Sequence, residues 1–397
     1  MNADALSPPS LPFNPDILRW AREWRGRSVA EAAHKAGVSE EKLFSWERGE
    51  TVPTVRQGRV LAGFYDRPFL EFFLSRRPNV AESDLVPDFR LHRDHPDPKG
   101  DRELKVIQAW AEDIRLNALD LFALVGEQPP SLPNGFHATL DTNPERAANE
   151  ARAHSTFSAE NQIALKGAER GKVSKLLRRS IEEMGVLVLK ESAIGRYGVR
   201  GMTVFATPLP IVVFGAEAPT AQAFTMAHEL GHIMLQQSAI SGPPSASDAR
   251  NEIERAERWC DEFAGAFLVP ADSMTKVWAK PNVPVAQIGD QLLGQLANTF
   301  SVSRHAMLIR LVQLSYVEKR FYWEIMRPKF LQQEAEFKGG GRSLYYGSRF
   351  RGSVGDMYTG LVLDAWGNGR ITNHNAAELM GTKSLRHLFD IRDHFTQ

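Results

Sequence analysis

The sequence predicts a mixed α+β protein that is mostly helical, with a small sheet in the middle of the chain. Apolar residues recur at three- and four-residue spacing over most of its length, which is typical of helices. Between Val186 and Gly215, β-branched and aromatic residues alternate over short runs, which indicates strands. Stretches rich in Pro, Gly and Ser separate these regions, so we expect an all-helical N-terminal unit, a central domain holding the sheet, and a helical C-terminal extension.

Composition suggests where these regions begin and end. We expect the helical N-terminal unit at residues 14–77, a linker and helical region at 78–170, the central domain at 171–317 and the extension at 318–397. The strands are expected in VLVLKES and MTVFATPLPIVVFG, and helices from about Thr220 to Val317. The extension contains KGGGRSLYYGSRFRGS, which is basic and glycine-rich and which we expect to be a loop, followed by two more helical stretches.

The overall composition argues against a secreted protein, a membrane-spanning protein and a protein that binds nucleic acid through its overall charge. With 397 residues, of which 43% are hydrophobic, the chain can bury the cores of two or three domains. Lys and Arg together number 48, as do Asp and Glu, so a DNA contact must come from a local patch and not from overall charge. A single cysteine, Cys260, suits a reducing compartment. The sequence shows no signal peptide and no apolar run of the ~18 residues that a membrane span needs, so we expect a cytoplasmic protein without membrane contact.

The motif that carries chemistry is H-E-L-G-H, from His228 to His232. Residues i and i+4 share one face of a helix, about 6 Å apart along its axis, so both imidazoles can bind one tetrahedral zinc ion (Zn2+). The adjacent Glu229 can then act as the general base that activates a water molecule. Gly231 lies inside this helix at a cost of about 1 kcal/mol relative to alanine, so we expect a neighbouring element to pack closely there.

A third metal ligand is expected on the segment from Asn251 to Pro270. Its apolar stripe includes Ile253 and Cys260, and Glu257 falls on that stripe. A carboxylate that faces a core is costly unless it is paired or metal-bound, so we predict Glu257 as the ligand, with Glu254 as the competitor one turn earlier. Asp261 shares this side of the helix and can accept a hydrogen bond from the far nitrogen of a ligand histidine.

These residues resemble the ImmA/IrrE family of bacterial zinc metallopeptidases, a gluzincin-like group. The resemblance rests on H-E-L-G-H and on E-x-x-C-D-x-F-A-x-x-F-L-V-P, which runs from Glu257 to Pro270. It implies a zincin-like domain in which Glu229 is the general base and His228, His232 and Glu257 bind zinc. Cys260 stands where the family commonly has alanine, and its ordinary role is that of a small buried residue. The strand Pro210–Phe214 resembles the family's sheet edge, along which a peptide could add as a strand.

The N-terminal unit resembles the Xre/Cro-repressor type of helix-turn-helix. The segment from Ser28 to Thr54 combines helix, a turn centred on Gly37, and helix, with the W-E-R-G signature at Trp46 to Gly49. The resemblance implies operator binding through a recognition helix starting at Ser39. On that helix Ser39, Glu40, Glu41, Lys42 and Ser45 would face DNA and Arg48 would support the contact.

The charge of this unit departs from the usual pattern. Between Ile17 and Val60, nine Lys and Arg stand against six Asp and Glu, a net charge of +3. Glu40 and Glu41 oppose the approach of a polyanion, although a carboxylate can accept a hydrogen bond from a cytosine amino group. A rim of arginines is expected to grip phosphates, with the unit binding as a dimer: Arg19, Arg22, Arg25, Arg27, Arg48, Arg56 and Arg59. The alternative is a helix-turn-helix used for dimerisation or protein docking.

Together these features lead to one functional hypothesis and two alternatives. The first is a DNA-binding regulator or antitoxin whose zinc endopeptidase domain cleaves a specific partner protein. The second is a non-catalytic antitoxin that neutralises a cognate toxin by binding, with the peptidase-like domain as the docking module. The third is a metallopeptidase whose helix-turn-helix only dimerises. The combination of a helix-turn-helix, a peptidase-like domain and a C-terminal extension resembles long members of the family that are encoded beside ribonuclease-like toxins. The glycine-rich segment could contact RNA, a partner or the protein's own cleft, and Tyr345 and Tyr346 could donate to an oxyanion or simply lie at the surface.

Overall fold

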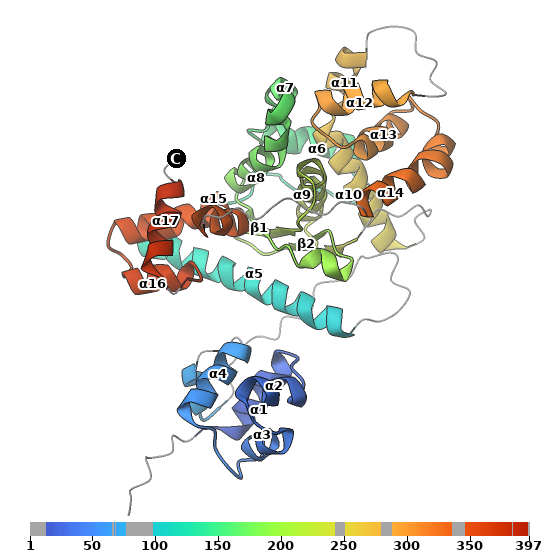
Figure 1. Cartoon of the computed structure of the whole chain (residues 1–397). Helices are drawn as coiled ribbons and strands as arrows, with labels where there is room; N and C mark the ends of the chain where they lie inside the picture. The colour runs from blue at the N-terminus through green and yellow to red at the C-terminus, as the bar shows by residue number, and fades with distance from the viewer. Residues whose placement is uncertain are drawn as a thin grey trace, which may run out of the picture. The chain divides into compact units, whose positions relative to one another are not determined.

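The chain forms two compact units, Met1–Asp84 with Pro98–Val106, and Leu85–Asp97 with Ile107–Gln397. Figure 1 shows the helices and strands of both units in a computed structural model. It describes residues 13–65, 67, 69–76, 98–242, 251–278, 288–335, 346–382 and 384–395. The fold class predicted from the sequence is confirmed, because the described residues form mostly helices and one four-stranded sheet.

The first unit contains short helices around a small apolar core that includes Ile17, Leu43 and Tyr65. Its elements are α1 (Pro15–Trp24), α2 (Val29–Ala36), α3 (Glu40–Glu47), α4 (Val55–Tyr65) and the short 3-10 helix η1 (Phe69–Phe73). Gly37 ends α2 in the left-handed conformation, with φ 69°, which a side chain would disfavour. Ser39 then caps α3 by accepting a hydrogen bond from the backbone of Lys42, so the helix begins where the sequence predicts.

A four-stranded sheet lies in the second unit, with strand order β1-β3-β2-β4. Its strands are β1 (Leu187–Lys190), β2 (Gly201–Val204), β3 (Ile211–Phe214) and β4 (Ala239–Ser241). β3 is parallel to β1 and antiparallel to β2, while β4 is antiparallel to β2. The prediction that Pro210–Phe214 forms the sheet edge is therefore wrong, because β3 pairs on both sides. The three-residue strand β4 follows directly after a helix and was not predicted.

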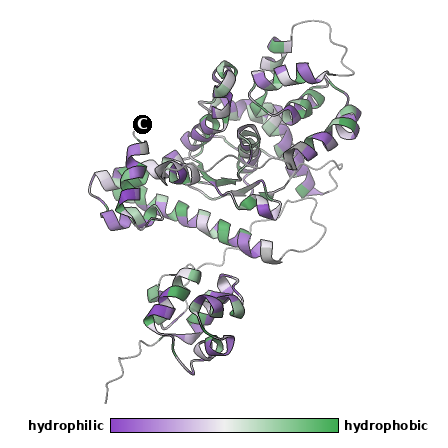
Figure 2. Cartoon of the chain, in the orientation of Figure 1, coloured by the Kyte–Doolittle hydropathy of each residue, from purple (hydrophilic) through white to green (hydrophobic). Residues whose placement is uncertain are grey.

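Helices cover this sheet, and α9 packs against β2, β3, α8 and α10. Figure 2 shows purple and green alternating along helices such as α5, as expected of amphipathic helices that cover a core. None of the helices in the described ranges is both long and apolar enough to cross a membrane. The α-helices are α5 (Pro98–Val125), α6 (Pro144–Ala153), α7 (Ala159–Ala164), α8 (Val173–Glu183), α9 (Pro219–Met234), α10 (Glu252–Leu268), α11 (Ala271–Trp278), α12 (Asp290–Thr299), α13 (Arg304–Gln313), α14 (Arg327–Ala335), α15 (Tyr346–Gly367), α16 (Asn373–Leu379) and α17 (Leu385–Phe395). The shorter helices are η2 (Gly167–Lys172), η3 (Ile194–Tyr197) and η4 (Phe321–Met326).

Helix α15 packs against β1, one of the two outer strands of the sheet. The helical geometry of α15 is interrupted at Gly355, where φ is 86°. The carbonyl groups of Val188 and Lys190 point away from β3. The Arg178 guanidinium donates to the first, and the Ser353 hydroxyl donates to the second over 3.1 Å. The carbonyl groups on this edge of the sheet are thus hydrogen-bonded by side chains. The prediction of a loop over 338–353 is wrong for residues 346–353, which begin α15, while residues 338–345 lie outside the described residues.

Candidate functional site

The H-E-L-G-H motif lies in the buried middle of α9, directly against α10. Pro219 at the first turn favours helix initiation, and apolar residues on several sides bury α9 almost completely. At Gly231 an added Cβ would lie 3.1 Å from the Cys260 sulfur and 3.2 Å from the Phe263 ring. The close packing expected at this glycine is therefore present. Because Gly231 precedes His232, this contact brings α10 next to the histidine pair.

Helices α9 and α10 bring His228, His232 and Glu257 together. One oxygen of Glu257, Oε1, lies 3.0 Å from Nε2 of His232, and the other, Oε2, lies 3.5 Å from Nε2 of His228. The two imidazole rings have centroids 5.1 Å apart. All three side chains are buried, so Glu257 is no surface acid. The hydroxyl of Ser241 on β4 lies 3.3 Å from Nε2 of His232.

Asp261 fixes the orientation of His228, as the sequence predicts for that carboxylate. Nδ1 of His228 lies 2.9 Å from Oδ1 of Asp261, a hydrogen bond in which the protonated Nδ1 donates. In the neutral ring the lone pair is then on Nε2 of His228, which lies 3.5 Å from Oε2 of Glu257 and has no hydrogen-bond partner in the described part of the chain. A buried nitrogen lone pair beside a second imidazole and a carboxylate is the donor set that a zinc ion takes, so these residues fit that metal.

Glu229 lies beside this cluster and is held by strand β2. The Thr203 hydroxyl is 2.7 Å from Oε2 of Glu229 and 3.1 Å from its backbone carbonyl. The other oxygen, Oε1, is buried without a hydrogen-bond partner among the residues that the structure describes. An added Cβ at Gly201 would lie 2.3 Å from that oxygen. The sequence predicted a strand here but gave no signal that Thr203 and Gly201 contact the motif, because this contact depends on strand register.

Burial and charge pairing act in opposite directions on these groups. Burial favours a low pKa for His228, but the charge of Glu257 and the hydrogen bond to Asp261 outweigh it and raise the His228 pKa well above its usual range, so a metal ion would have to displace the second proton of this ring. Burial opposes ionisation of Glu257, yet its contacts with His228 and His232 lower the Glu257 pKa to about 2. Burial raises the pKa of Glu229, with the nearby histidines and Thr203 opposing that rise. Glu257 is therefore an ionised carboxylate.

Other candidate ligands fit less well. The carboxylate of Glu254 lies 3.2 Å from the amide of Asn251 at the start of α10, and Glu254 lies outside the histidine cluster. Ile253, predicted as part of the core-facing stripe, is exposed, which corrects that expectation. Cys260 is buried and offers a sulfur within 4.8 Å of potential ligand atoms of His228 and His232. Burial and three nearby carboxylates raise the pKa of its thiol well above the usual range, so we retain Glu257 as the expected third ligand.

Two known protein families match parts of this chain. Residues 181–312 match the family described as the IrrE N-terminal-like domain, a peptidase family, and residues 18–72 match a helix-turn-helix family. The chain joins a helix-turn-helix domain to an IrrE-like domain. A search of curated proteins found no match. The IrrE-like match contains both α9 and α10, so the histidine pair and Glu257 lie inside a metallopeptidase-like domain.

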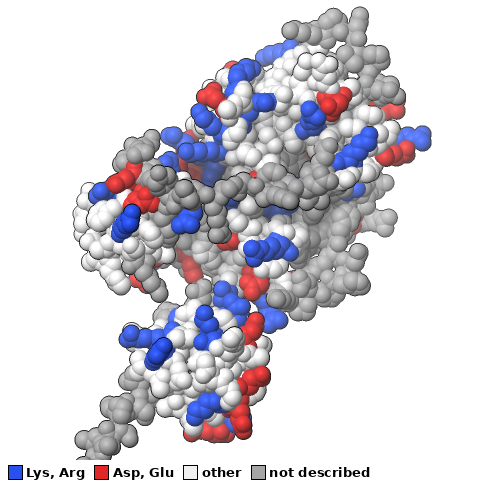
Figure 3. All heavy atoms as spheres, viewed as in Figure 1, with Lys and Arg blue, Asp and Glu red and all other residues white. Residues whose placement is uncertain are grey.

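In the helix-turn-helix domain, the outward face of α3 is more acidic than a DNA-reading helix usually is. Glu40, Glu41 and Lys42 are exposed. Figure 3 shows acidic side chains at the lower border of this domain, where α3 lies in Figure 1. The fold and the family match support DNA binding, and the exposed acids on α3 reduce its attraction to phosphate.

Several of the residues expected to contact DNA already have partners within this domain. Ser39 caps α3, and the Ser45 hydroxyl donates to the Lys42 carbonyl. Arg48 forms two hydrogen bonds to the exposed carboxylate of Glu50, at 2.7 and 3.0 Å. The prediction that Arg22 belongs to a phosphate-gripping rim is wrong. Arg22 is buried and forms a bidentate ion pair with buried Glu47, at 2.6 and 2.8 Å, which joins α1 to α3.

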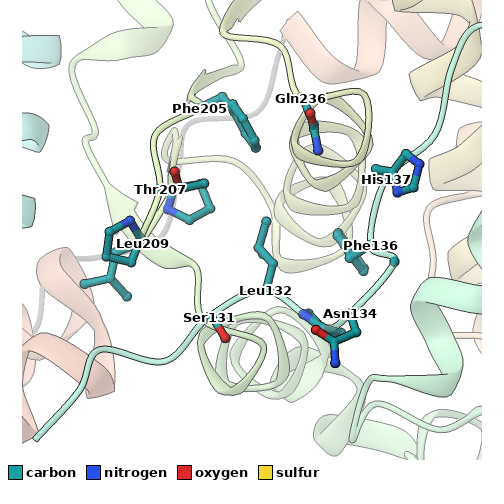
Figure 4. A pocket seen from close by; sticks show the side chains of 13 residues that line it. Ser131, Leu132, Asn134, Phe136, His137, Phe205, Thr207, Leu209 and Gln236 are labelled. Atoms are coloured by element: carbon teal, nitrogen blue, oxygen red, sulfur yellow. The ribbon is translucent and has the colours of Figure 1, made fainter.

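A pocket of about 430 Å³ lies near the end of α9 in the second unit (Figure 4). Leu132, Phe205 and Gln236 point toward its middle. Its lining does not include His228, Glu229 or His232. The lining is mainly apolar and brings no set of titratable side chains together. It therefore adds no group to the cluster of His228, His232 and Glu257.

Proposed function

We propose that the chain is a DNA-binding regulator whose IrrE-like domain is a zinc-dependent endopeptidase acting on one specific partner protein. The helix-turn-helix domain supports binding to operator DNA, and the IrrE-like domain supports a metallopeptidase type of site. The observation that carries the proposal is the convergence of His228, His232 and Glu257 on one buried point, with Glu229 beside it. A partner protein, such as a toxin encoded nearby, is the proposed substrate.

Each side chain of the cluster has a separate proposed role. His228, His232 and Glu257 would hold the ion, and Asp261 would keep the Nε2 lone pair of His228 turned toward it. Zinc bound there would polarise a peptide carbonyl and acidify a water molecule. Glu229, held through Oε2, would use its other oxygen, Oε1, to take a proton from that water and pass it to the leaving amine.

Metal content is the first test, because it needs no substrate. The purified full chain is expected to contain about one zinc per molecule, and Glu257→Ala is expected to lose most of it, since three ligands are typical of a catalytic zinc site. Glu254→Ala is the matched control, one turn earlier on α10, and should retain zinc. If Glu257→Ala keeps its zinc and Glu254→Ala loses it, the ligand assignment is wrong.

Cleavage is tested with Glu229→Gln. This variant keeps the side-chain shape and should retain zinc, but it cannot take the proton and is expected to lose cleavage by a factor of about 100 or more. A partner protein is sought by comparing the proteomes of cells that produce the wild type or the variant. Full cleavage by Glu229→Gln would refute the catalytic role. A biological effect that is insensitive to this substitution would favour the alternative, in which the domain acts by docking.

A further inference from the structure

Strand β2 touches the side chain of Glu229 at two positions, Gly201 and Thr203. These residues lie two apart, so their side-chain positions share one face of the strand. One position has no side chain, and the other carries a hydroxyl that reaches the carboxylate. Both are buried, and the comparisons assign neither of them a role.

The contact at Thr203 holds one oxygen of Glu229 and leaves the other available. The hydroxyl donates over 2.7 Å to Oε2, and it also lies 3.1 Å from the Glu229 carbonyl. No described residue donates a hydrogen bond to Oε1, although this oxygen is buried. A buried carboxylate oxygen without a donor is costly, and chains keep such a group where it is used.

The contact at Gly201 depends on the absence of a side chain. An added Cβ would lie 2.3 Å from Oε1 of Glu229 and 2.7 Å from both Cγ and Cδ of the same side chain. Ordinary contacts are above 3.4 Å, so alanine at this position would displace the carboxylate. Gly201 has no positive φ, which means that the close approach, and not backbone conformation, requires glycine.

We propose that Gly201 and Thr203 are positioning residues that hold the Glu229 carboxylate in one orientation, with Oε1 presented to the water at the metal. The inference rests on the proposed endopeptidase function, because it assigns a purpose to the orientation. The contacts themselves are independent of that function. Strand β2 thereby has a second role besides pairing with β3 and β4: it orients the general base.

The first test is a double-mutant cycle on the metal-free full chain. Gly201→Ala should lower the Tm by roughly 3 °C or more, since overpacking costs stability. In a Glu229→Ala background, the same change should lower it by less than about 1 °C, because the vacated space admits the methyl group. Gly195→Ala, whose added Cβ meets no atom within 4 Å, is the control. Equal losses in both backgrounds would overturn the packing part of the inference, and a Gly201→Ala chain that folds only in the Glu229→Ala background would support it.

The second test concerns the hydroxyl of Thr203. Calorimetry measures the affinity of the zinc-loaded full chain for acetohydroxamate. A hydroxamate chelates zinc and carries N–H and O–H donors, and the carboxylate of Glu229 would accept a hydrogen bond from one of them. Thr203→Val should weaken its binding by about tenfold or more, because a Glu229 carboxylate that is no longer held would lose its charged hydrogen bond to the ligand. Thr203→Ser should stay within about threefold of wild type, because it restores the donor. Thr225→Val, which removes a hydroxyl that donates over 2.7 Å to Glu217, is the matched control and should bind as wild type.

The outcomes separate this inference from the proposed function. If the Thr203→Val variant retains zinc and binds acetohydroxamate as tightly as the wild type does, Thr203 does not position Glu229. The endopeptidase proposal would be unaffected by that result. A wild-type chain that takes up no zinc would refute the endopeptidase proposal, and the metal-free cycle would still decide whether Gly201 and Glu229 pack as described. Rescue by serine distinguishes positioning from simple core packing, because valine fills the same volume.

Discussion

Nδ1 of His228 lies 2.9 Å from Oδ1 of Asp261, a contact that joins α9 to α10. The hydrogen bond determines which nitrogen of the imidazole carries the proton, and hence which one is free to bind a metal. Asp261 is one turn after Glu257 on the same helix, so α10 supplies both the expected ligand and the group that orients another ligand.

Removing this hydrogen bond should weaken metal binding without breaking the fold. Asp261→Ala is expected to lower zinc affinity by about 10- to 100-fold, the usual effect of losing such a support. Asp261→Asn keeps an acceptor and should lose less. Competition with a chelating dye measures both values. Unchanged affinity in Asp261→Ala would show that His228 needs no support from α10.

The acidic face of α3 should shape DNA binding. In anisotropy titrations with a random-sequence duplex, Lys42→Ala should weaken binding and reduce the salt slope by about one. Glu41→Gln should strengthen binding several-fold at low salt, because it removes a charge that repels phosphate. Lys166→Ala, an exposed lysine of the second unit, is the control. If neither α3 variant changes binding, α3 is not the DNA-contacting helix, and the dimerisation or docking alternative is favoured.

The ion pair between Arg22 and Glu47 should stabilise the first unit. Arg22→Ala leaves the buried carboxylate of Glu47 without its partner and is expected to cost about 3 kcal/mol. Arg19→Ala removes an exposed ion pair with Asp16 and should cost less than about 1 kcal/mol. Hydrogen exchange over residues 14–65 of the full chain measures both effects. Similar protection in the two variants would contradict the structural role of Arg22.

Glu182 should make the stability of the second unit depend on pH. Burial raises the pKa of Glu182 to about 7, although the charge of Arg178 and the backbone N–H groups of Met357 and Asp356 oppose that rise. The folded chain therefore binds a proton that the unfolded chain releases near pH 4.5. The resulting stabilisation is complete below pH 4.5 and is lost as the pH rises through 7, at most roughly 3 kcal/mol.

Glu182→Gln removes this titration and tests the dependence. Urea unfolding at pH 5 and pH 8 should show a larger loss of stability in wild type than in Glu182→Gln. The exposed carboxyl of Glu169 gives the control, Glu169→Gln, which should keep the wild-type dependence. Parallel curves for wild type and Glu182→Gln would show that the carboxyl of Glu182 titrates alike in the folded and unfolded chain.

The features predicted best from the sequence are local ones. The turn at Gly37, the start of α3 at Ser39 and the helix that carries His228 and His232 all depend on residues a few positions apart. Glu257 was predicted from a different signal, a carboxylate on a helix face that otherwise faces the core. Helical periodicity, together with the cost of burying a carboxylate, therefore predicted that His228, His232 and Glu257 would meet, although Ile253 on the same predicted stripe is exposed.

The features that could not be predicted depend on pairing between distant segments. Strand order is set by the whole sheet, so the interior position of β3 was beyond a sequence reading, as was the short strand β4. Gly201 and Thr203 meet Glu229 only through the register of β2 against its neighbours. Arg22 looked like one more surface arginine, because its partner Glu47 is 25 positions away. Residues 346–353 looked like a loop from their glycines, yet tertiary contacts hold them as a helix.

The hydrogen bonds at the outer strand have a practical consequence for anyone who shortens this protein. Arg178 and Ser353 both lie outside residues 181–312, the segment that matches the IrrE-like family. In a fragment trimmed to that match, the carbonyl groups of Val188 and Lys190 would lose these hydrogen-bond donors. The edge strand β1 could then pair with strands of other copies and cause aggregation. We expect such a fragment to precipitate when it is produced alone, and longer versions that keep α8 and α15 to remain in solution.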